Sequence, residues 1–574
     1  MKQRTFRPAA IAAAVACIFG WSGAIAGPVF NWATVVNNGD LAPGSTTAKF
    51  FSYNQPSIND AGLVVFRARA RPPAGAASSS GGGGQGEPIT GIFTRDMSAV
   101  ASSINAVAVR NGIVPDPNNV TKPGSATFNE FPSFPRIDAK SDNLAFRGQS
   151  TPSWVTTLPD GSETRSGTTG LYATPGGGTL ITGIRNIVPS AFPQYLVPNQ
   201  STDTRFDQFP GAPSPTGNIV TFKGNWTDST GAGQTGVYFR DMVADGGTSP
   251  VVEVARRGMA IPGAAIPVGY TGTGVFDSTS PPSAAAGKMV FTGLDNEQAP
   301  TAGGIFMAPL TANPTLTTVA GFNTMVPKNG SNTLTAFGEG LSLDGRYVGF
   351  WAGWGTETFS KQVSCAVDGN PDVTAYCLQQ DNNGTVGDGI YNFDVLKNQG
   401  IFLADTMLDK LFLVAQTGAG LYDDFLFWNF SGHVPGQGSS EEELEEGARW
   451  RSSAFVAIDG NDVVFKALKG DVSGLYGALD VSDAFDFADL FTIVDTSMDG
   501  GVLDPMAAGL PIVSLGIERD GFRNSRLAIN ASMASAEEGW AGIYATSVPE
   551  PSSYALAALA LAGLGATSRR RGSR

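Results

Sequence analysis

A glycine followed by an aliphatic residue and then an aromatic residue recurs at wide intervals along this 574-residue chain. Seven copies occur, 66 to 96 residues apart: Gly91-Ile92-Phe93, Gly170-Leu171-Tyr172, Gly236-Val237-Tyr238, Gly304-Ile305-Phe306, Gly400-Ile401-Phe402, Gly474-Leu475-Tyr476 and Gly542-Ile543-Tyr544. This spacing leaves room in each repeat for a four-stranded sheet and one long loop. Such a chain is expected to stack small sheets rather than to form one large core.

Strand-like segments flank each copy of the motif. Before it, a strand ends in an aromatic residue, and these ends are Phe66, Phe146, Phe222, Phe291, Phe350 and Phe465, with residues 527–529 as a degenerate seventh. After it comes an alternating strand, as in residues 107–112. One sheet could not bury both of its faces, whereas seven sheets stacked radially would cover one another. We therefore predict an all-β, seven-bladed β-propeller, with tandem β-sandwiches as the alternative.

The two ends of the repeat array indicate how the ring would close. The seventh copy stops at residues 542–547 without its alternating strand, and residues 30–44 match that missing part as it occurs in residues 252–263. The N-terminal strand is therefore predicted to complete the last sheet, which would hide an otherwise open edge.

One copy of the strand segment resembles a known repeat. Residues 342–350, Ser-Leu-Asp-Gly-Arg-Tyr-Val-Gly-Phe, are similar to the Ser-x-Asp-Gly-x-x-x-x-Phe segment of TolB-like propeller repeats. The other copies lack the Asp-Gly pair or its polar spacing. The resemblance supports the fold and not a Tol-type role.

The first 26 residues have the order of a secretory signal peptide. A positive start is followed by an apolar run and a small-x-small cleavage site, supplied by Lys2, Arg4 and Arg7, by residues 9–20 and by Ala24-Ile25-Ala26. Residues 27–547 then form the propeller domain.

Residues 548–574 combine a proline-rich motif, a short apolar stretch and a basic cluster: Pro549, Glu550 and Pro551, residues 554–567, and Arg569, Arg570 and Arg571. This order resembles the PEP-CTERM sorting signal of bacteria. The resemblance implies handling by an exosortase, a location at the cell surface or in the extracellular matrix, and an association with extracellular polysaccharide. The apolar stretch is shorter than the ~20 residues of a comfortable spanning helix, so we expect a transient anchor in the inner membrane.

Composition agrees with a turn-rich, exported β-protein. The chain has 73 glycines, 36 prolines and only 15% charged residues. Without the two terminal signals, the chain has 30 basic and 50 acidic residues, a net charge of about −20. This balance disfavours nucleic acid and anionic membranes as partners.

Two cysteines, Cys365 and Cys377, stand twelve positions apart in the longest insertion, residues 353–398. A disulfide that staples a long loop is the preferred interpretation in an oxidising compartment. In the same insertion Asp381, Asn383 and Asp388 offer oxygen ligands at close spacing. A plain Asn/Gly turn is favoured over calcium there, because the strict Asp-x-Asp-x-Asp-Gly order and its closing Glu are missing.

No catalytic residues can be named from the sequence. The only histidine is His433, no Gly-x-Ser-x-Gly segment occurs, and no cofactor motif is present. We therefore predict a non-enzymatic surface or matrix protein that uses its propeller as a binding or structural module. The alternative is an extracellular polysaccharide hydrolase or lyase that uses loop carboxylates, which an acidic cluster in a central pocket would favour.

Overall fold

A computed structural model of the protein describes residues 29–73, 88–99, 102–116, 126–157, 163–186, 192–200, 204–366, 371–380, 382–418, 420–432, 434 and 447–548. Strands dominate these residues, and α2 (Pro371–Gln379) is the α-helix among them. The expected signal peptide, residues 1–26, and the sorting residues Pro549, Glu550, Pro551, Arg569, Arg570 and Arg571 lie outside the described residues.

Seven antiparallel sheets follow one another along the chain, and we call them blades 1 to 7. Blades 1 and 2 contain β2 (Lys49–Tyr53), β3 (Ser57–Ile58), β4 (Leu63–Arg71), β5 (Ile89–Asp96) and β6 (Asn105–Val109), then β7 (Thr127–Glu130), β8 (Arg136–Ile137), β9 (Leu144–Thr157), β10 (Glu163–Ala173) and β11 (Ile181–Arg185). Blades 3 and 4 contain β12 (Ser214–Thr216), β13 (Ile219–Thr227), β14 (Gly233–Asp241) and β15 (Val252–Arg256), then β16 (Ser278–Thr279), β17 (Ser283–Ala285), β18 (Lys288–Leu294), β19 (Gly303–Pro309) and β20 (Thr317–Gly321).

Blade 5 contains β21 (Leu334–Phe337), β22 (Ser342–Leu343), β23 (Tyr347–Ser364), β24 (Ile390–Asp405) and β25 (Lys410–Gln416). Blade 6 contains β28 (Val456–Asp459), β29 (Asp462–Lys469), β30 (Val472–Ala478) and β31 (Phe491–Asp495). Blade 7 contains β32 (Ile512–Gly516), β33 (Phe522–Arg523), β34 (Arg526–Ala534), β35 (Gly539–Ser547) and β1 (Ala33–Asn37). A separate hairpin is formed by β26 (Phe427–Ser431) and β27 (Arg449–Ser453).

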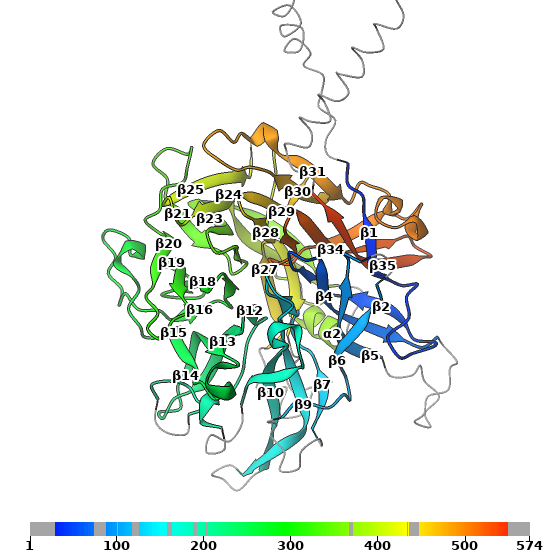
Figure 1. The fold of residues 1–574 in the computed structure, drawn as a ribbon. Helices are drawn as coiled ribbons and strands as arrows, with labels where there is room; N and C mark the ends of the chain where they lie inside the picture. Colours follow the sequence, from blue (N-terminus) through cyan, green and yellow to red (C-terminus); the bar gives the residue numbers. More distant parts are fainter. Residues whose placement is uncertain are drawn as a thin grey trace, which may run out of the picture.

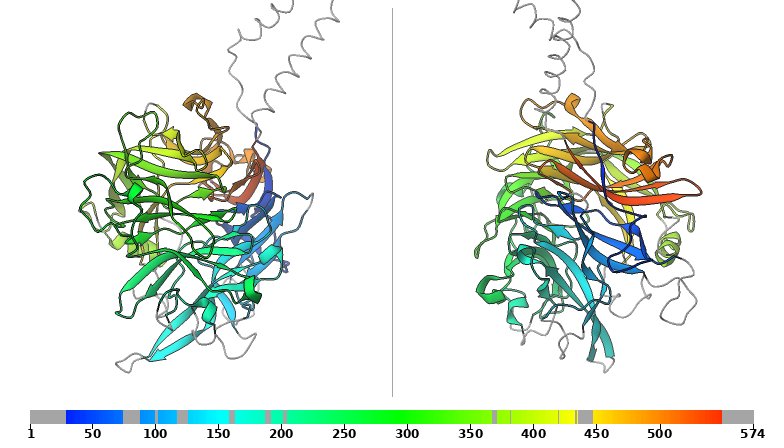
Figure 2. Two further views of the ribbon diagram at one scale, coloured as in Figure 1. Left: turned by 60° about the vertical axis from the view of Figure 1, so that its left-hand side comes forward. Right: turned by 45° about the vertical axis from the view of Figure 1, so that its right-hand side comes forward.

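The blades are arranged as a closed ring, so the predicted seven-bladed propeller is confirmed. Figure 1 shows the colours running once around the molecule, from blue blade 1 to red blade 7. In Figure 2 the long hairpin of β9 and β10 projects from the body.

The N-terminal strand closes the ring as predicted. β1 pairs with β35 in antiparallel register, Ala33 opposite Ala545 and Asn37 opposite Gly542, and becomes the outermost strand of blade 7. Val35 and Val36 are completely buried in the core shared by blades 7 and 1. The first and last repeats are thereby joined without a covalent link.

The two sequence motifs pair with each other inside each blade. Phe66 lies opposite Phe93 in blade 1, with ring centroids 5.9 Å apart. Stacked or tilted pairs of the same kind, 5.5 to 6.0 Å apart, occupy five more blades: Phe146–Tyr172, Phe222–Tyr238, Phe291–Phe306, Phe350–Phe402 and Phe465–Tyr476. In blade 7 the aliphatic Ile529 faces Tyr544. Aromatic pairs of this geometry contribute more to stability than the apolar area they bury would give.

The glycine of the motif is required by close approach of the outer strand. A Cβ on Gly91 would lie 2.7 Å from the Ala108 carbonyl oxygen, and one on Gly542 would lie 2.7 Å from that of Val36. The register between the third and outer strands shifts at this point in all seven blades. A β-bulge of this kind bends the strand and increases its twist.

The insertion predicted as a long loop is mostly regular structure instead. β23 continues to Ser364 and pairs with β24 from Ile390 onwards, and α2 lies between them. Residues 359–363 alternate between half-buried and exposed side chains, which is the pattern of a strand with one covered face. We call this extension, together with α2 and the β26–β27 hairpin, the blade 5 arm.

Candidate functional site

The innermost strand of most blades is divided into two short pieces. In blade 1, β3 pairs with the start of β4, Ile58 opposite Val64, whereas β2 pairs with its end, Tyr53 opposite Ala68. The pieces at one end of the propeller form a closed inner ring, in which β3, β8, β12, β17, β22, β28, β33 and again β3 are successive neighbours. The other pieces are separate from this ring, and the space between the blades is open there.

Buried charged side chains occupy the centre of the inner ring. Arg136 of blade 2 donates to Glu518 of blade 7 at 2.6 Å and to the carbonyl oxygen of Pro282 of blade 4 at 3.1 Å. Arg519 donates to the carbonyl oxygen of Pro281 at 3.4 Å. Burial opposes ionisation of Glu518, but Arg136 and Arg519 outweigh it and hold its pKa below the ordinary value. These contacts across the axis close one end of the central space.

We call the layer formed by Arg136, Glu518 and Arg519 the floor. Above it lies a cavity of about 2860 Å³, lined by residues of all seven blades and of the β26–β27 hairpin. Small-molecule pockets typically measure ~300–1,000 Å³. Among the described residues, eleven arginines and lysines and six aspartates and glutamates line the cavity, a net formal charge of +5 in a chain whose total is −14. The cavity is therefore large, polar and basic within an acidic protein.

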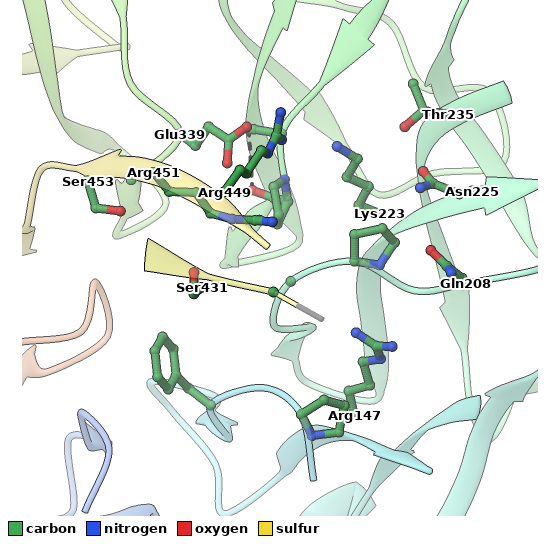
Figure 3. A pocket seen from close by; sticks show the side chains of 18 of the residues that line it. Arg147, Gln208, Lys223, Asn225, Thr235, Glu339, Ser431, Arg449, Arg451 and Ser453 are labelled. Atoms are coloured by element: carbon green, nitrogen blue, oxygen red, sulfur yellow. Dashed lines mark hydrogen bonds between the residues drawn. The ribbon is translucent and has the colours of Figure 1, made fainter. Parts of the chain in front are cut away.

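One side of the cavity is basic because a single repeat position is basic in three successive blades. Arg67, Arg147 and Lys223 each follow the aromatic residue that ends the second strand. Each lies opposite the aliphatic residue of the glycine motif, at Ile92, Leu171 and Val237. Figure 3 shows the side chains of Arg147 and Lys223 pointing into the cavity. We call Arg67, Arg69, Arg147 and Lys223 the basic wall.

Arg67 is half-buried and lacks an ion-pair partner among the described residues. Its Nε–H group is buried and donates to no partner among these residues. Burial and, to a smaller extent, repulsion by Arg69 lower the pKa of Arg67 to about 10, against the opposing effect of Glu130. Arg69 stands two residues along β4 and is exposed to the cavity. A buried charge without a counter-ion is costly, so an anion at this position would stabilise it.

The blade 5 arm forms the opposite side of the cavity. Arg449 and Arg451 of β27 point toward the same space as Arg147 and Lys223 in Figure 3. Trp428 and Trp450 also line it, and Trp428 stacks on Phe393 with ring centroids 4.3 Å apart. The cavity thus presents aromatic and basic side chains across from the basic wall.

Several of the acidic residues in the cavity are engaged in ion pairs. Asp277 pairs with Arg257 at 2.8 Å, Glu297 with Arg449 at 3.2 Å, and Glu518 with Arg136 and Arg519. Asp207 is different, because burial raises its pKa and its partner is the hydroxyl group of Thr227, which donates at 2.8 Å. With most of its acidic side chains paired and its basic ones in excess, the described part of the cavity is suited to holding anions.

The residues singled out from the sequence that the structure describes are not among those that line the cavity. Cys365 and Cys377 are joined by a disulfide in the blade 5 arm, where both are buried. The Asn383 amide donates to the Asp388 carboxylate at 2.9 Å, and both side chains also accept backbone N–H groups of their own loop. Asp381 and His433 lie outside the described residues, and the described part of the chain contains no cluster of three metal-ligating side chains.

Sequence reasoning missed the basic wall, although a signal for it exists. An aromatic residue, a basic residue, a small residue and a polar residue recur at 66–69, 146–149 and 222–225. The strand in blade 1 continues this pattern as Arg67-Ala68-Arg69-Ala70-Arg71, which places three arginines on one face. The net negative charge of the whole chain gave no indication of this local excess of positive charge.

Comparison with known proteins identifies the C-terminal segment. Residues 547–571 match the PEP-CTERM protein-sorting motif. The chain carries a PEP-CTERM signal. This motif implies an exported protein that is sorted to the cell surface, as the sequence predicted. No helix of the described residues is long and apolar enough to cross a membrane. The resemblance of residues 342–350 to TolB-like repeats is not confirmed.

No curated protein matches the chain. Among solved structures, similarity extends to Zg3597, a family 117 glycoside hydrolase of the marine bacterium Zobellia galactanivorans, with 12% identity over 60% of this chain and 86% of that chain and a TM-score of 0.25. A puromycin-hydrolyzing peptidase of Mycobacterium tuberculosis has 9% identity over 88% and 53%, with a TM-score of 0.35. Trypanosoma rangeli sialidase has 11% identity over 78% and 58%, with a TM-score of 0.30. At these scores the likeness carries no argument about activity.

Proposed function

We propose that this protein is a non-enzymatic, exported binding module that holds a segment of extracellular polysaccharide in its central cavity. The observation that carries this proposal is the cavity itself, which is several times larger than a small-molecule pocket and closed at its floor. Its lining combines aromatic rings with hydrogen-bonding and charged groups, the mixture that fixes a polar ligand in place. A rigid ring of seven blades presents these groups without large rearrangement.

The terminal segments direct the export and the sorting of this module. Residues 1–26 direct export and are cleaved after Ala26, and residues 548–574 are handled by an exosortase after a transient stay in the inner membrane. The mass of the secreted form tests both cleavages. A mature protein that starts at Gly27 and lacks the basic cluster Arg569–Arg571 is expected, and an intact tail would contradict processing.

The binding itself is tested by titrating the purified protein with exopolysaccharide from a bacterium that makes it. Saturable binding is expected, and Ser453→Trp should weaken it because Ser453 is exposed on β27 and lines the cavity. Val268→Trp is the matched control, since Val268 is fully exposed and lies outside the cavity. Absence of saturable binding, or equal affinity of both variants, would overturn the proposal. Release of reducing or unsaturated sugars during the titration would instead establish the hydrolase or lyase alternative.

A further inference from the structure

The size of the cavity suits a polysaccharide in general, and its positive charge suits an acidic one. Resting on the proposed function, we infer that the cavity selects an acidic polysaccharide, one that carries carboxylate or sulfate groups, and binds it between the basic wall and the blade 5 arm. Arg67, Arg69 and Lys223 are the residues that would contact these groups first.

The basic wall supplies the attraction. Arg67, Arg69 and Lys223 have no ion pair with another described residue, whereas Arg257 and Arg449 on other parts of the cavity are paired with carboxylates. Their charges lie in a concave space that is closed at its floor, where water screens them less than on a flat surface. A ligand carboxylate or sulfate would supply the counter-ion that half-buried Arg67 lacks within the described residues.

The spacing of these cations suits a chain-like ligand rather than a single ion. Arg67, Arg147 and Lys223 occupy equivalent positions on blades 1, 2 and 3, so successive cations follow the curve of the ring. The opposite side adds Trp428 and Trp450, whose rings offer apolar surface to the CH faces of sugars. A polymer with one acidic group on each sugar or each second sugar would meet one blade after another.

The rest of the molecule disfavours the most common competing polyanion. Outside the cavity the protein is strongly acidic, because the whole chain carries −14 although the cavity carries +5. Duplex DNA, with one charge per ~1.7 Å of its axis, would be repelled wherever it extended beyond the cavity. An acidic polysaccharide has fewer charges along its length and loses less by leaving the cavity. We therefore assign the site to a polysaccharide.

Calorimetric titration with three probes tests the assignment: sodium alginate as a polyuronate, neutral dextran of similar length, and a duplex DNA. Alginate is expected to bind most tightly, and its affinity should fall as NaCl is raised. The double variant Arg69→Gln/Lys223→Gln should weaken alginate binding by about tenfold or more, because two charge-assisted contacts are lost. Neither side chain is needed by the core, and an unchanged thermal midpoint would verify that the variant is folded.

The control is Lys397→Gln/Lys410→Gln, which removes the same charge from exposed ion pairs outside the cavity and should change affinity by less than about twofold. Equal loss in both double variants would overturn the basic wall as the binding site. Equal binding of dextran and alginate, both blocked by Ser453→Trp, would overturn selection of acidic sugars while leaving the proposed function intact. Binding of DNA at the same site with higher affinity than alginate would overturn the polysaccharide assignment, and no binding of any polysaccharide would overturn both proposals.

Discussion

The glycine of the recurring motif is set by a steric requirement that can be tested at single positions. In blade 3, a Cβ on Gly236 would lie 2.7 Å from both the Ala255 carbonyl oxygen and the Tyr238 hydroxyl. Both atoms belong to packed parts of the blade, since Ala255 and Tyr238 are completely buried. Neither can move aside without disturbing the contact with the next blade, so even a methyl group is too large here.

Gly236→Ala is therefore expected to cost about 1–3 kcal/mol of stability, as overpacking usually does. Thermal unfolding followed by circular dichroism measures the effect. Gly233→Ala, on the same strand, is the matched control, because no atom lies within 4 Å of a Cβ at that position. A Gly236→Ala variant as stable as this control would show that the outer strand can shift to make room for a methyl group.

Lys466 of blade 6 occupies the same repeat position as Arg67, but it is covered by the blade 5 arm. Its Nζ lies 3.9 Å from the centroid of the Phe427 ring, which favours the charged form, and burial lowers its pKa to about 8. An unfolded lysine has a pKa of about 10.4, so the unfolded state binds more protons between about pH 8 and pH 10.4. The contribution of Lys466 to the free energy of unfolding must then rise with pH across this window.

Replacing Lys466 by methionine removes this dependence. The stability difference between the variant and the wild type is expected to shift by roughly 2–3 kcal/mol between about pH 7.5 and pH 10.4, in favour of the wild type at the higher pH. Urea unfolding at the two pH values measures it, with Lys469→Met, at the exposed end of the same strand, as control. A difference that does not change with pH would contradict a depressed pKa.

At the scale of elements, the blade 5 arm has a small core of its own. Cys365, Cys377 and Tyr391 are buried together, and Trp450 lies over Tyr391 with ring centroids 5.2 Å apart. Lys361 also forms an ion pair with Asp424 that links the extended strand to the segment before β26. This core is too small to be stable without covalent support, and the disulfide limits the freedom of the unfolded arm.

Replacing both cysteines by serine is expected to destabilise the arm by about 2–3 kcal/mol, the value for a loop of this length. Amide hydrogen exchange should then quicken in residues 358–364 and 390–396 while the strands of blades 1 to 3 keep their protection. Polysaccharide affinity should fall as well, because Trp428 and Trp450 form one side of the cavity. Unchanged exchange in the arm would mean that packing alone holds it.

Elements with a strong repeated pattern could be predicted from the sequence, and those without one could not. The second and third strands of blades 1 to 6 carry the aromatic and glycine motifs, which could be found in the sequence because they form the same contact in each of these blades. The innermost strands are pieces of two to five residues, too short to show alternation. The cavity was missed because each blade contributes only a few side chains, which become neighbours when the ring closes.

At the scale of the whole molecule, closure of the ring depends on ten residues near the N-terminus, 29–38. β1 covers the edge of β35, and the Asn37 amide donates to Asp504 at 2.7 Å, where Trp540 also donates at 3.0 Å. Without β1, blade 7 would present an unpaired edge and the core between blades 7 and 1 would be open. Blade 1 could then move, and Arg67 and Arg69 would be displaced relative to the rest of the basic wall.

Removing residues 29–38 is therefore expected to lower the thermal midpoint and to produce dimers or larger aggregates, as light scattering would report. Removing residues 549–574 is the control, since they follow the last strand and should leave both measurements unchanged. A synthetic peptide of residues 29–44 should restore the monomer when added in excess, because the pairing between β1 and β35 needs no covalent link. A shortened chain that stays monomeric and keeps its thermal midpoint would mean that blades 7 and 1 close the ring through their own packing.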